Sequence, residues 1–273
     1  MRTFKVTLAY DGTDFAGWQR QPNKRTVQGE LERALTRITT QPVHCIASGR
    51  TDAGVHALGQ VASFESPTRH SGEVLCKALN AVLPEDIVVF EVAEARPRFH
   101  ALRDALRKRY RYVIQDGPFL DLFARRYVWH IRQQLDVAAM QEAGKALVGT
   151  HDFESYQTSG SSRLTTVRTV YDVLVERRQA ELTDRVVIEV EANGFLYNMV
   201  RNIAGTLVEV GKGRRPIDWP GRVLEQKDRR TAGMTAPPQG LFLVGVEYAD
   251  ECETQNSECG IADATDEDIA PLE

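Results

Sequence analysis

The segment most suited to chemistry is a glycine-rich stretch, Gly49 to His56, that carries the carboxylate of Asp52. Its two glycines allow tight backbone conformations, so the loop can hold Asp52 in a fixed orientation between Arg50 and His56. A fixed carboxylate can serve as a nucleophile. An aspartate among glycine and threonine is also a common turn former, so the local pattern by itself is compatible with a structural role.

A second candidate segment, from Arg107 to Tyr112, interleaves cations with aromatic rings. In a strand, the period of two places Tyr110 and Tyr112 on one face and Arg109 and Arg111 on the other. Cations neutralise phosphates and a phenol ring stacks on an unpaired base, which fits RNA with an extruded nucleotide. A strand with its tyrosines in the core and a solvated basic face has the same pattern.

A third candidate is Arg201, near the start of a helix predicted over 196–210. The helix dipole gives a cation no benefit at that end, so another group is expected to hold the side chain. A buried carboxylate is one such partner, and a simple surface arginine is the alternative.

Other chemistries lack their motifs. There is no phosphate-binding loop, no His-Glu-x-x-His, no Gly-x-Ser-x-Gly and no Gly-x-Gly-x-x-Gly after a strand. The four cysteines have no zinc-type spacing, and no carboxylates cluster beside the Asp52 loop as a metal-dependent phosphoryl-transfer enzyme would need. We therefore expect neither a metal nor a cofactor.

Hydrophobic periodicity predicts the elements that position these candidates. The first half of the chain has the order β-α-β-β-α-β: a strand over 3–10, a helix over 27–38 capped by Thr26, strands over 43–47 and 60–65, a helix over 74–82 and a strand over 87–93. The second half repeats the order: a strand over 109–114, a helix over 136–148, strands over 167–177 and 185–191, a helix over 196–210 and a strand over 241–248, with 127–131 as an added strand.

This order predicts an α+β protein with two ferredoxin-like halves, residues 1–104 and 105–249. Their strands are expected to form a mixed, mostly antiparallel sheet with a central cleft where ligands bind. Residues 250–273 carry nine acidic and no basic residues and lack periodicity, which predicts a disordered tail.

The charge of the chain is segregated. The whole chain has 34 Lys and Arg against 38 Asp and Glu, so setting aside the nine acidic residues of the tail leaves a net charge of +5 for residues 1–249. A basic body suits a polyanionic partner. The chain enters a strand pattern at its N-terminus without a signal-peptide region and has no run of membrane-spanning length, so we expect a cytoplasmic protein.

Taken together, these segments resemble the TruA-type tRNA pseudouridine synthase family, and the similarity extends from residue 3 to residue 248. The segments that carry it are Phe15–Gln21, Gly49–Ala57, Phe99–Ala101, Arg109–Tyr112, Asn198–Asn202 and Gly240–Val244. The resemblance implies a pseudouridine synthase fold and a homodimer that isomerises uridine at positions 38–40 of the tRNA anticodon stem-loop, without metal or cofactor.

The resemblance also implies roles for individual residues. Asp52 matches the catalytic aspartate, which would be the nucleophile, and Arg201 the arginine that pairs with it. Tyr110 matches the tyrosine that stacks on the target uracil, and Arg50 an arginine that helps to hold the flipped-out nucleotide. One departure from the family pattern is Leu102, which stands where Phe-His-Ala is usually followed by arginine.

The implied reaction breaks the N1 glycosidic bond, turns the uracil and rejoins it through C5. A single carboxylate can assist by attack at C1′ or C6, or by abstraction of a sugar proton, and the sequence does not choose among these. The alternative function is a non-catalytic RNA-binding or RNA-folding module. Such a module would be expected to carry a damaged loop, whereas Asp52, Tyr110 and Arg201 are all present.

Overall fold

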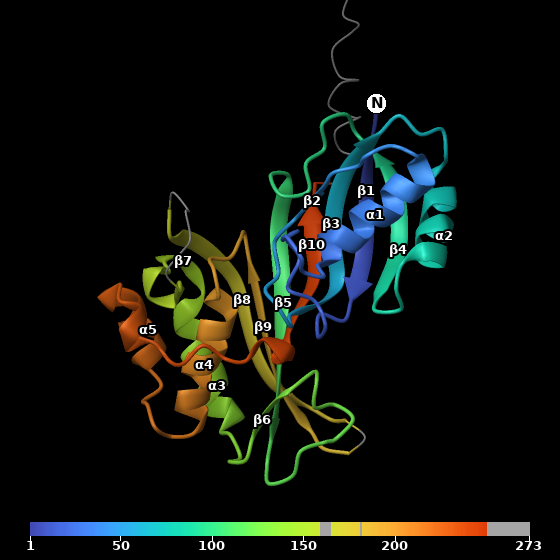
Figure 1. Ribbon diagram of the computed structural model, residues 1–273. Helices are drawn as coiled ribbons and strands as arrows, with labels where there is room; N and C mark the ends of the chain where they lie inside the picture. The colour runs from blue at the N-terminus through green and yellow to red at the C-terminus, as the bar shows by residue number, and fades with distance from the viewer. Residues whose placement is uncertain (159–164, 181, 250–273) are drawn as a thin grey trace, which may run out of the picture.

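One ten-stranded, mostly antiparallel sheet crosses the whole molecule (Figure 1). The computed structural model describes residues 1–158, 165–180 and 182–249. The strand order is β4-β1-β3-β10-β5-β9-β8-β7, with β2 paired to β3 and β6 paired to β5. The predicted α+β class is confirmed.

The first half forms the predicted β-α-β-β-α-β unit. Its elements are β1 (Arg2–Tyr10), α1 (Val27–Thr39), β2 (Cys45–Ala47), β3 (His56–Ser66), α2 (Gly72–Val82) and β4 (Ile87–Ala95). The spatial order β4-β1-β3-β2 is antiparallel throughout. Thr26 caps α1 as expected, because its hydroxyl accepts a hydrogen bond from Gly29 N.

The second half has the same strand order, β10-β5-β9-β8. Its main elements are β5 (Ala105–Asp116), α3 (Val137–Gly144), β8 (Val167–Arg178), β9 (Arg185–Ala192), α4 (Met199–Gly211) and β10 (Leu241–Tyr248). The added strand expected over 127–131 is β6 (Trp129–Ile131), parallel to β5. The helix expected over 136–148 ends earlier, at Gly144, and continues as a short 3₁₀ turn over Lys145–Leu147. Among the strands and α-helices of the described residues, the edge strand β7 (Gly149–Asp152) and the helix α5 (Trp219–Gln226) were not predicted.

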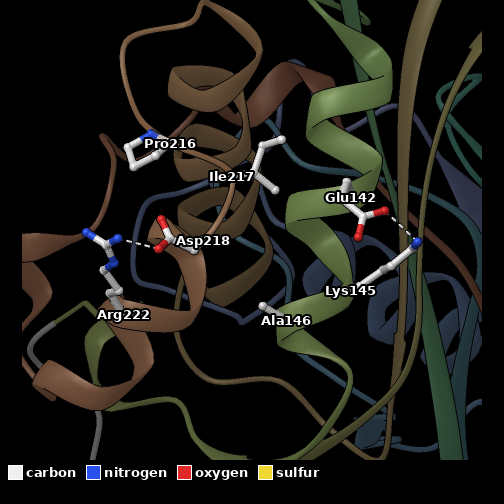
Figure 2. Close-up of a pocket in the computed structure, with 7 residues that line it drawn as sticks. All are labelled: Glu142, Lys145, Ala146, Pro216, Ile217, Asp218 and Arg222. Carbon is white, nitrogen blue, oxygen red and sulfur yellow. Dashed lines mark hydrogen bonds and ion pairs between the residues drawn. The ribbon is translucent and has the colours of Figure 1, made fainter.

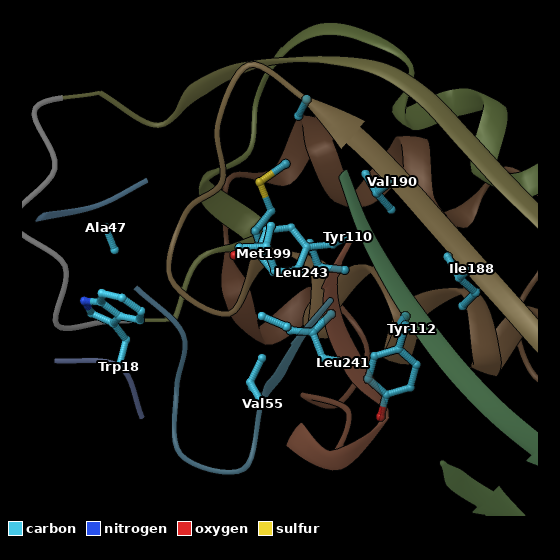
Figure 3. Packing of buried hydrophobic residues seen from close by; sticks show 14 of the residues in the cluster. Trp18, Ala47, Val55, Tyr110, Tyr112, Ile188, Val190, Met199, Leu241 and Leu243 are labelled. Atoms are coloured by element: carbon cyan, nitrogen blue, oxygen red, sulfur yellow. The ribbon is translucent and has the colours of Figure 1, made fainter. Parts of the chain in front are cut away.

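The last strand joins the two halves. β10 runs antiparallel to β5 and, at Phe242 and Leu243, parallel to the start of β3. Leu243 therefore pairs with Tyr110 on one side and with Ala57 on the other. Buried side chains from both halves meet beneath this joint (Figure 3). The joint fixes the β2–β3 loop, which contains Asp52, beside β5.

The alternating segment of β5 divides between two environments. Tyr110 and Tyr112 are buried on one face, as the period of two predicts. Arg109 and Arg111 lie on the opposite face and pair with acidic residues of β9: Arg109 Nη2 is 2.5 Å from Glu191 Oε2, and Arg111 Nε donates to Glu189 Oε1 over 2.8 Å. The suggestion that this basic face neutralises phosphates is therefore wrong for these two arginines.

The boundary expected near residue 104 lies in the segment between β4 and β5. The expected disordered tail, residues 250–273, lies outside the described residues. Within the described part of the chain, no helix is long and apolar enough to cross a membrane.

The joint predicts a strong stability effect at Leu243. We expect Leu243→Ala to lower the free energy of unfolding by about 2–5 kcal/mol, because it removes a fully buried side chain from the core shared by both halves. The matched control is Val244→Ala, the partly buried neighbour, which should cost roughly 1 kcal/mol. Urea denaturation followed by circular dichroism measures both. Equal losses for the two variants would contradict this account of the joint.

Candidate active site

The end of β1 and the segment between β1 and α1 hold the Asp52 loop in place. Thr51 O accepts a hydrogen bond from Trp18 N over 3.0 Å, and Thr51 Oγ1 lies 2.7 Å from Tyr10 Oη. Gly17 has a φ of 91°, and a Cβ there would lie 2.7 Å from Thr51 O, so only glycine permits this approach. The residue next to Asp52 is thus held by both its backbone and its side chain.

A buried polar network that includes Gln60 of β3 and Lys108 of β5 also holds the loop in place. Gln60, on β3, donates from Nε2 to Gly49 O over 2.9 Å and to Tyr10 Oη over 3.3 Å. Its Oε1 accepts from Ser48 Oγ over 2.7 Å, and Lys108 Nζ donates to Ser48 O. Burial raises the pKa of Tyr10 to about 12, so its hydroxyl stays protonated and able to donate. Every member has a partner, as a rigid buried network requires.

The end of the loop is held by His56. Its Nδ1 accepts from Gly12 N over 3.0 Å, and its Nε2 lies 3.2 Å from Arg126 O. Burial lowers the pKa of His56, although the nearby Asp11 carboxylate opposes this. His56 Nδ1 also lies 3.1 Å from Asp11 Oδ1. His56 therefore ties the loop to two other segments of the chain.

Asp52 faces Arg201 across the joint. Arg201 Nη1 lies 3.6 Å from Asp52 Oδ2, within ion-pair distance. Neutral acceptors hold the guanidinium in place: Nε donates to Ala236 O over 2.7 Å, and Nη1 donates to Asn198 Oδ1 over 2.8 Å. Burial is the larger influence on the Asp52 carboxyl and raises its pKa, while Arg201 acts to lower it.

A cavity of about 1170 Å³ contains this pair and is lined by both halves. All four residues singled out in the sequence, Asp52, Arg201, Tyr110 and Arg50, lie in its wall. Among the described residues that line it, Asp52 is the only carboxylate, whereas five are cations: Arg50, Arg103, Lys108, Arg168 and Arg201. The cavity therefore suits a polyanionic ligand that brings a neutral group to a single carboxylate.

Tyr110 contributes an aromatic surface to the cavity. Its ring packs edge-on against Phe195 at 5.0 Å, and burial raises its pKa above the ordinary value. The side chain therefore remains a neutral phenol at physiological pH. Arg50, by contrast, is exposed at the cavity wall. Among the described residues, no three His, Cys, Asp or Glu side chains are grouped so that they could hold a metal ion.

A second hollow, of about 910 Å³, lies between α3 and the start of α5 (Figure 2). Its charged residues are paired with one another, Glu142 with Lys145 and Asp218 with Arg222. It contains no nucleophile beside a base and no residue of the Asp52 loop. The cavity at the joint is therefore the candidate active site.

Comparison with known proteins identifies the family. The family model described as tRNA pseudouridine synthase matches residues 7–102 and 143–249. The chain belongs to this family. It is 47% identical over 248 residues to tRNA pseudouridine synthase A of Thermoanaerobacter sp. (strain X514), covering 91% of this chain and all of the relative. The corresponding protein of Limosilactobacillus fermentum is 48% identical over 259 residues, covering 94% and 100%. A solved Cbf5-Nop10-Gar1 complex is only distantly similar, with a TM-score of 0.34 and 13% identity over 89% of this chain and 59% of the other.

As a member of the tRNA pseudouridine synthase family, the chain is an isomerase. The network residues Tyr10 and Gln60 were not predicted from the sequence, and neither was the place of Arg168 in the cavity wall. A polar Gln60 at an inward position of a strand was the available signal. Leu102 and Arg103 both reach the wall, from a turn in which His100 Nδ1 accepts from both backbone N–H groups.

The Asp52–Arg201 geometry predicts a pKa change. We expect Arg201→Met to raise the pKa of Asp52 further, because the variant removes the cation that favours the carboxylate and keeps the burial that opposes it. Carboxyl ¹³C NMR of labelled protein across a pH titration measures this pKa. Arg50→Met is the matched control and should move the Asp52 pKa less, since Arg50 is exposed. An unchanged or lowered Asp52 pKa in Arg201→Met would show that the ion pair does not control ionisation.

Proposed function

We propose that this protein isomerises uridine to pseudouridine at positions 38–40 of the tRNA anticodon stem-loop, with Asp52 as the nucleophile acting on a flipped-out nucleotide. The observation that carries the proposal is the placement of Asp52, the single carboxylate among the described residues of the cavity wall, 3.6 Å from Arg201. Family membership supports tRNA as the substrate, and the resemblance to TruA-type enzymes supplies the positions. The proposed compartment is the cytoplasm, where this substrate is found.

The cavity wall fits an extruded nucleotide. Removing a base from its stack costs roughly a few kcal/mol, which new contacts must offset. Arg50 can neutralise phosphate charge at the cavity wall, and the neutral ring of Tyr110 offers a surface on which uracil stacks. The cations of the wall therefore match the phosphate of a nucleotide, and its aromatic surface matches the base.

Asp52 is suited to the chemical step. Isomerisation breaks the N1–C1′ bond, forms a C5–C1′ bond, and exchanges a proton between C5 and N1, so it needs no external donor or oxidant. A carboxylate can attack C1′ or C6, or remove a sugar proton, and each route requires Asp52 in its ionised form. Burial disfavours that form and Arg201 partly offsets the effect of burial, which gives the arginine a direct role in preparing the nucleophile. The hydrogen-bonded loop limits the orientations that the carboxylate can adopt.

This proposal predicts a selective loss of activity at Asp52. We expect Asp52→Ala to reduce pseudouridine formation by roughly a thousandfold or more, because no other described carboxylate lines the cavity. RNA affinity should persist, since the cations remain. Pseudouridine is mapped by carbodiimide adducts on unmodified tRNA incubated with protein, and affinity is measured by filter binding at fixed salt.

The matched control is Asp14→Ala, which removes an exposed carboxylate from the β1–α1 segment outside the cavity wall. It should retain wild-type activity. Turnover by Asp52→Ala close to that of the wild type would eliminate Asp52 as the nucleophile. Binding without turnover by the wild-type protein would instead identify an RNA-binding module.

The homodimer forms part of the proposal, and an exposed apolar loop supports it. Between β5 and β6, Phe119 and Phe123 are 78% and 81% exposed, and Leu120 and Leu122 beside them are also exposed. The loop is anchored rather than free, because Asp121 pairs with Arg185 at 2.5 Å. Fixed apolar side chains of this size usually mark an association surface, and a second copy of the chain is the partner we propose.

We expect the double variant Phe119→Ser with Phe123→Ser to be a monomer, because it removes two exposed aromatic anchors. Light scattering coupled to size exclusion should give twice the chain mass of 30.6 kDa for the wild type and the single mass for the variant. Phe90→Ser is the matched control, since Phe90 is 59% exposed on β4, outside this loop. A wild-type protein that elutes as a monomer at micromolar concentration would refute the homodimer.

A further inference from the structure

Tyr197 presents an aromatic ring to the candidate active site from a rigid backbone. It lies just before Asn198, the N-cap residue of α4. The Tyr197 carbonyl oxygen accepts from Thr158 N over 3.1 Å, and Leu196 O accepts from Met199 N over 3.1 Å. Asn198, which follows it, adopts a left-handed conformation with a φ of 60° and accepts from Arg201 through its side chain. The backbone that carries Tyr197 is thus part of the framework that holds Arg201.

The side chain of Tyr197 does not belong to the packed core. It is 45% exposed and lines the cavity, whereas its neighbours Leu196 and Met199 are buried. No described residue hydrogen bonds to its hydroxyl or packs a ring or cation against it. An exposed aromatic ring on a fixed backbone binds a planar ligand with little loss of conformational entropy.

Tyr197 and Tyr110 lie at different depths of the same cavity. Tyr110 is only 8% exposed and packs against Phe195, so it belongs to the inner part, and the more exposed Tyr197 belongs to the outer part. The volume of about 1170 Å³ exceeds the roughly 300–1000 Å³ typical of sites for one small ligand. The cavity therefore has room for more than the single nucleotide that Tyr110 would contact.

The outer wall also carries cations suited to the backbone of a second nucleotide. Arg50 and Arg103 both line the cavity and are exposed, and no described residue pairs with either guanidinium. An exposed guanidinium can donate to a phosphate in a bidentate manner. An aromatic ring and phosphate-binding cations in one wall are the combination that single-stranded RNA uses.

We propose that Tyr197 stacks on the base adjacent to the uridine that is isomerised. The proposal rests on the function proposed above. When a nucleotide is extruded, the base beside it loses one stacking neighbour, and a phenol ring in the outer wall replaces that neighbour. Tyr197 is then a binding residue for the flanking nucleotide. It stabilises the extruded state without contacting the reacting atoms.

The test compares protein variants on matched RNAs. The substrates are an anticodon stem-loop hairpin with one target uridine and two versions that are abasic at the 5′ or the 3′ neighbour of that uridine. We expect Tyr197→Ala to weaken binding of the intact hairpin about tenfold, and Tyr197→Phe to bind like the wild type. On one of the abasic hairpins, wild type and Tyr197→Ala should bind equally. The kcat of Tyr197→Ala on the intact hairpin should stay within about twofold of the wild type, since Asp52 is unaffected.

Tyr171→Ala is the matched control, because Tyr171 is 39% exposed and stacks under Arg107, away from the cavity wall. It should bind all three hairpins like the wild type. Wild-type affinity in Tyr197→Ala, or an equal loss on intact and both abasic hairpins, overturns the stacking role. Fluorescence anisotropy measures RNA binding whether or not turnover occurs. A wild-type protein that binds RNA but forms no pseudouridine therefore counts against the proposed function. The comparison of Tyr197 variants by binding still tests the stacking role in that case.

Discussion

The insertion of β10 between β3 and β5 is the constraint on which the candidate site depends. This strand is the last of the second half, yet it hydrogen bonds to the strand that begins where the Asp52 loop ends. Asp52 comes from the first half, and Tyr110 and Arg201 come from the second. The three side chains can share one cavity only because β10 joins the strands of the two halves into one sheet in a fixed register. The buried contacts of Leu243 and Tyr110 at the joint (Figure 3) are therefore as important to the site as the charges of Asp52 and Arg201.

The arginines of β5 and the cations of the cavity wall differ in how far their charge is neutralised. On the face of β5 opposite Tyr110, Arg109 and Arg111 are neutralised by Glu189 and Glu191 of β9. In the cavity wall, five cations are described with the single carboxylate of Asp52. The net charge of -4 for the whole chain thus hides a local excess of positive charge, and local charge governs the attraction of a polyanion. Such attraction is screened by salt and weakens as the ionic strength rises.

The sequence predicted the regular elements well because their apolar residues repeat with clear periods. It missed β7 because this four-residue edge strand has no alternation, and α5 because Pro220 and Gly221 lie in its first turn and weaken the helical signal. The face of Arg109 and Arg111 was predicted, but their use was not. Their partners lie about 80 residues away, and a period of two gives no information about which strand is the neighbour.

The sequence likewise predicted the chemical groups of the candidate site but not the network that holds them. The chemical groups Asp52, Arg201, Tyr110 and Arg50 were recognisable because the resemblance covers nearly the whole chain. The network of Tyr10, Gln60 and Ser48 was not recognisable, because each residue has an ordinary structural explanation and only their hydrogen bonds reveal a common function.

That network explains how a loop with two glycines can hold the Asp52 carboxylate in place. Glycine gives the loop the conformations it needs but also adds freedom in the unfolded chain, which folding must overcome. Here Gly17 allows the neighbouring segment to approach Thr51. Hydrogen bonds that involve Tyr10 and Gln60 restrict the loop, and His56 at its end accepts a hydrogen bond from Gly12 N. The side chain of Asp52 itself accepts no described hydrogen bond and faces only Arg201. The backbone is therefore rigid while the carboxylate oxygens stay available, which is the arrangement that a nucleophile requires.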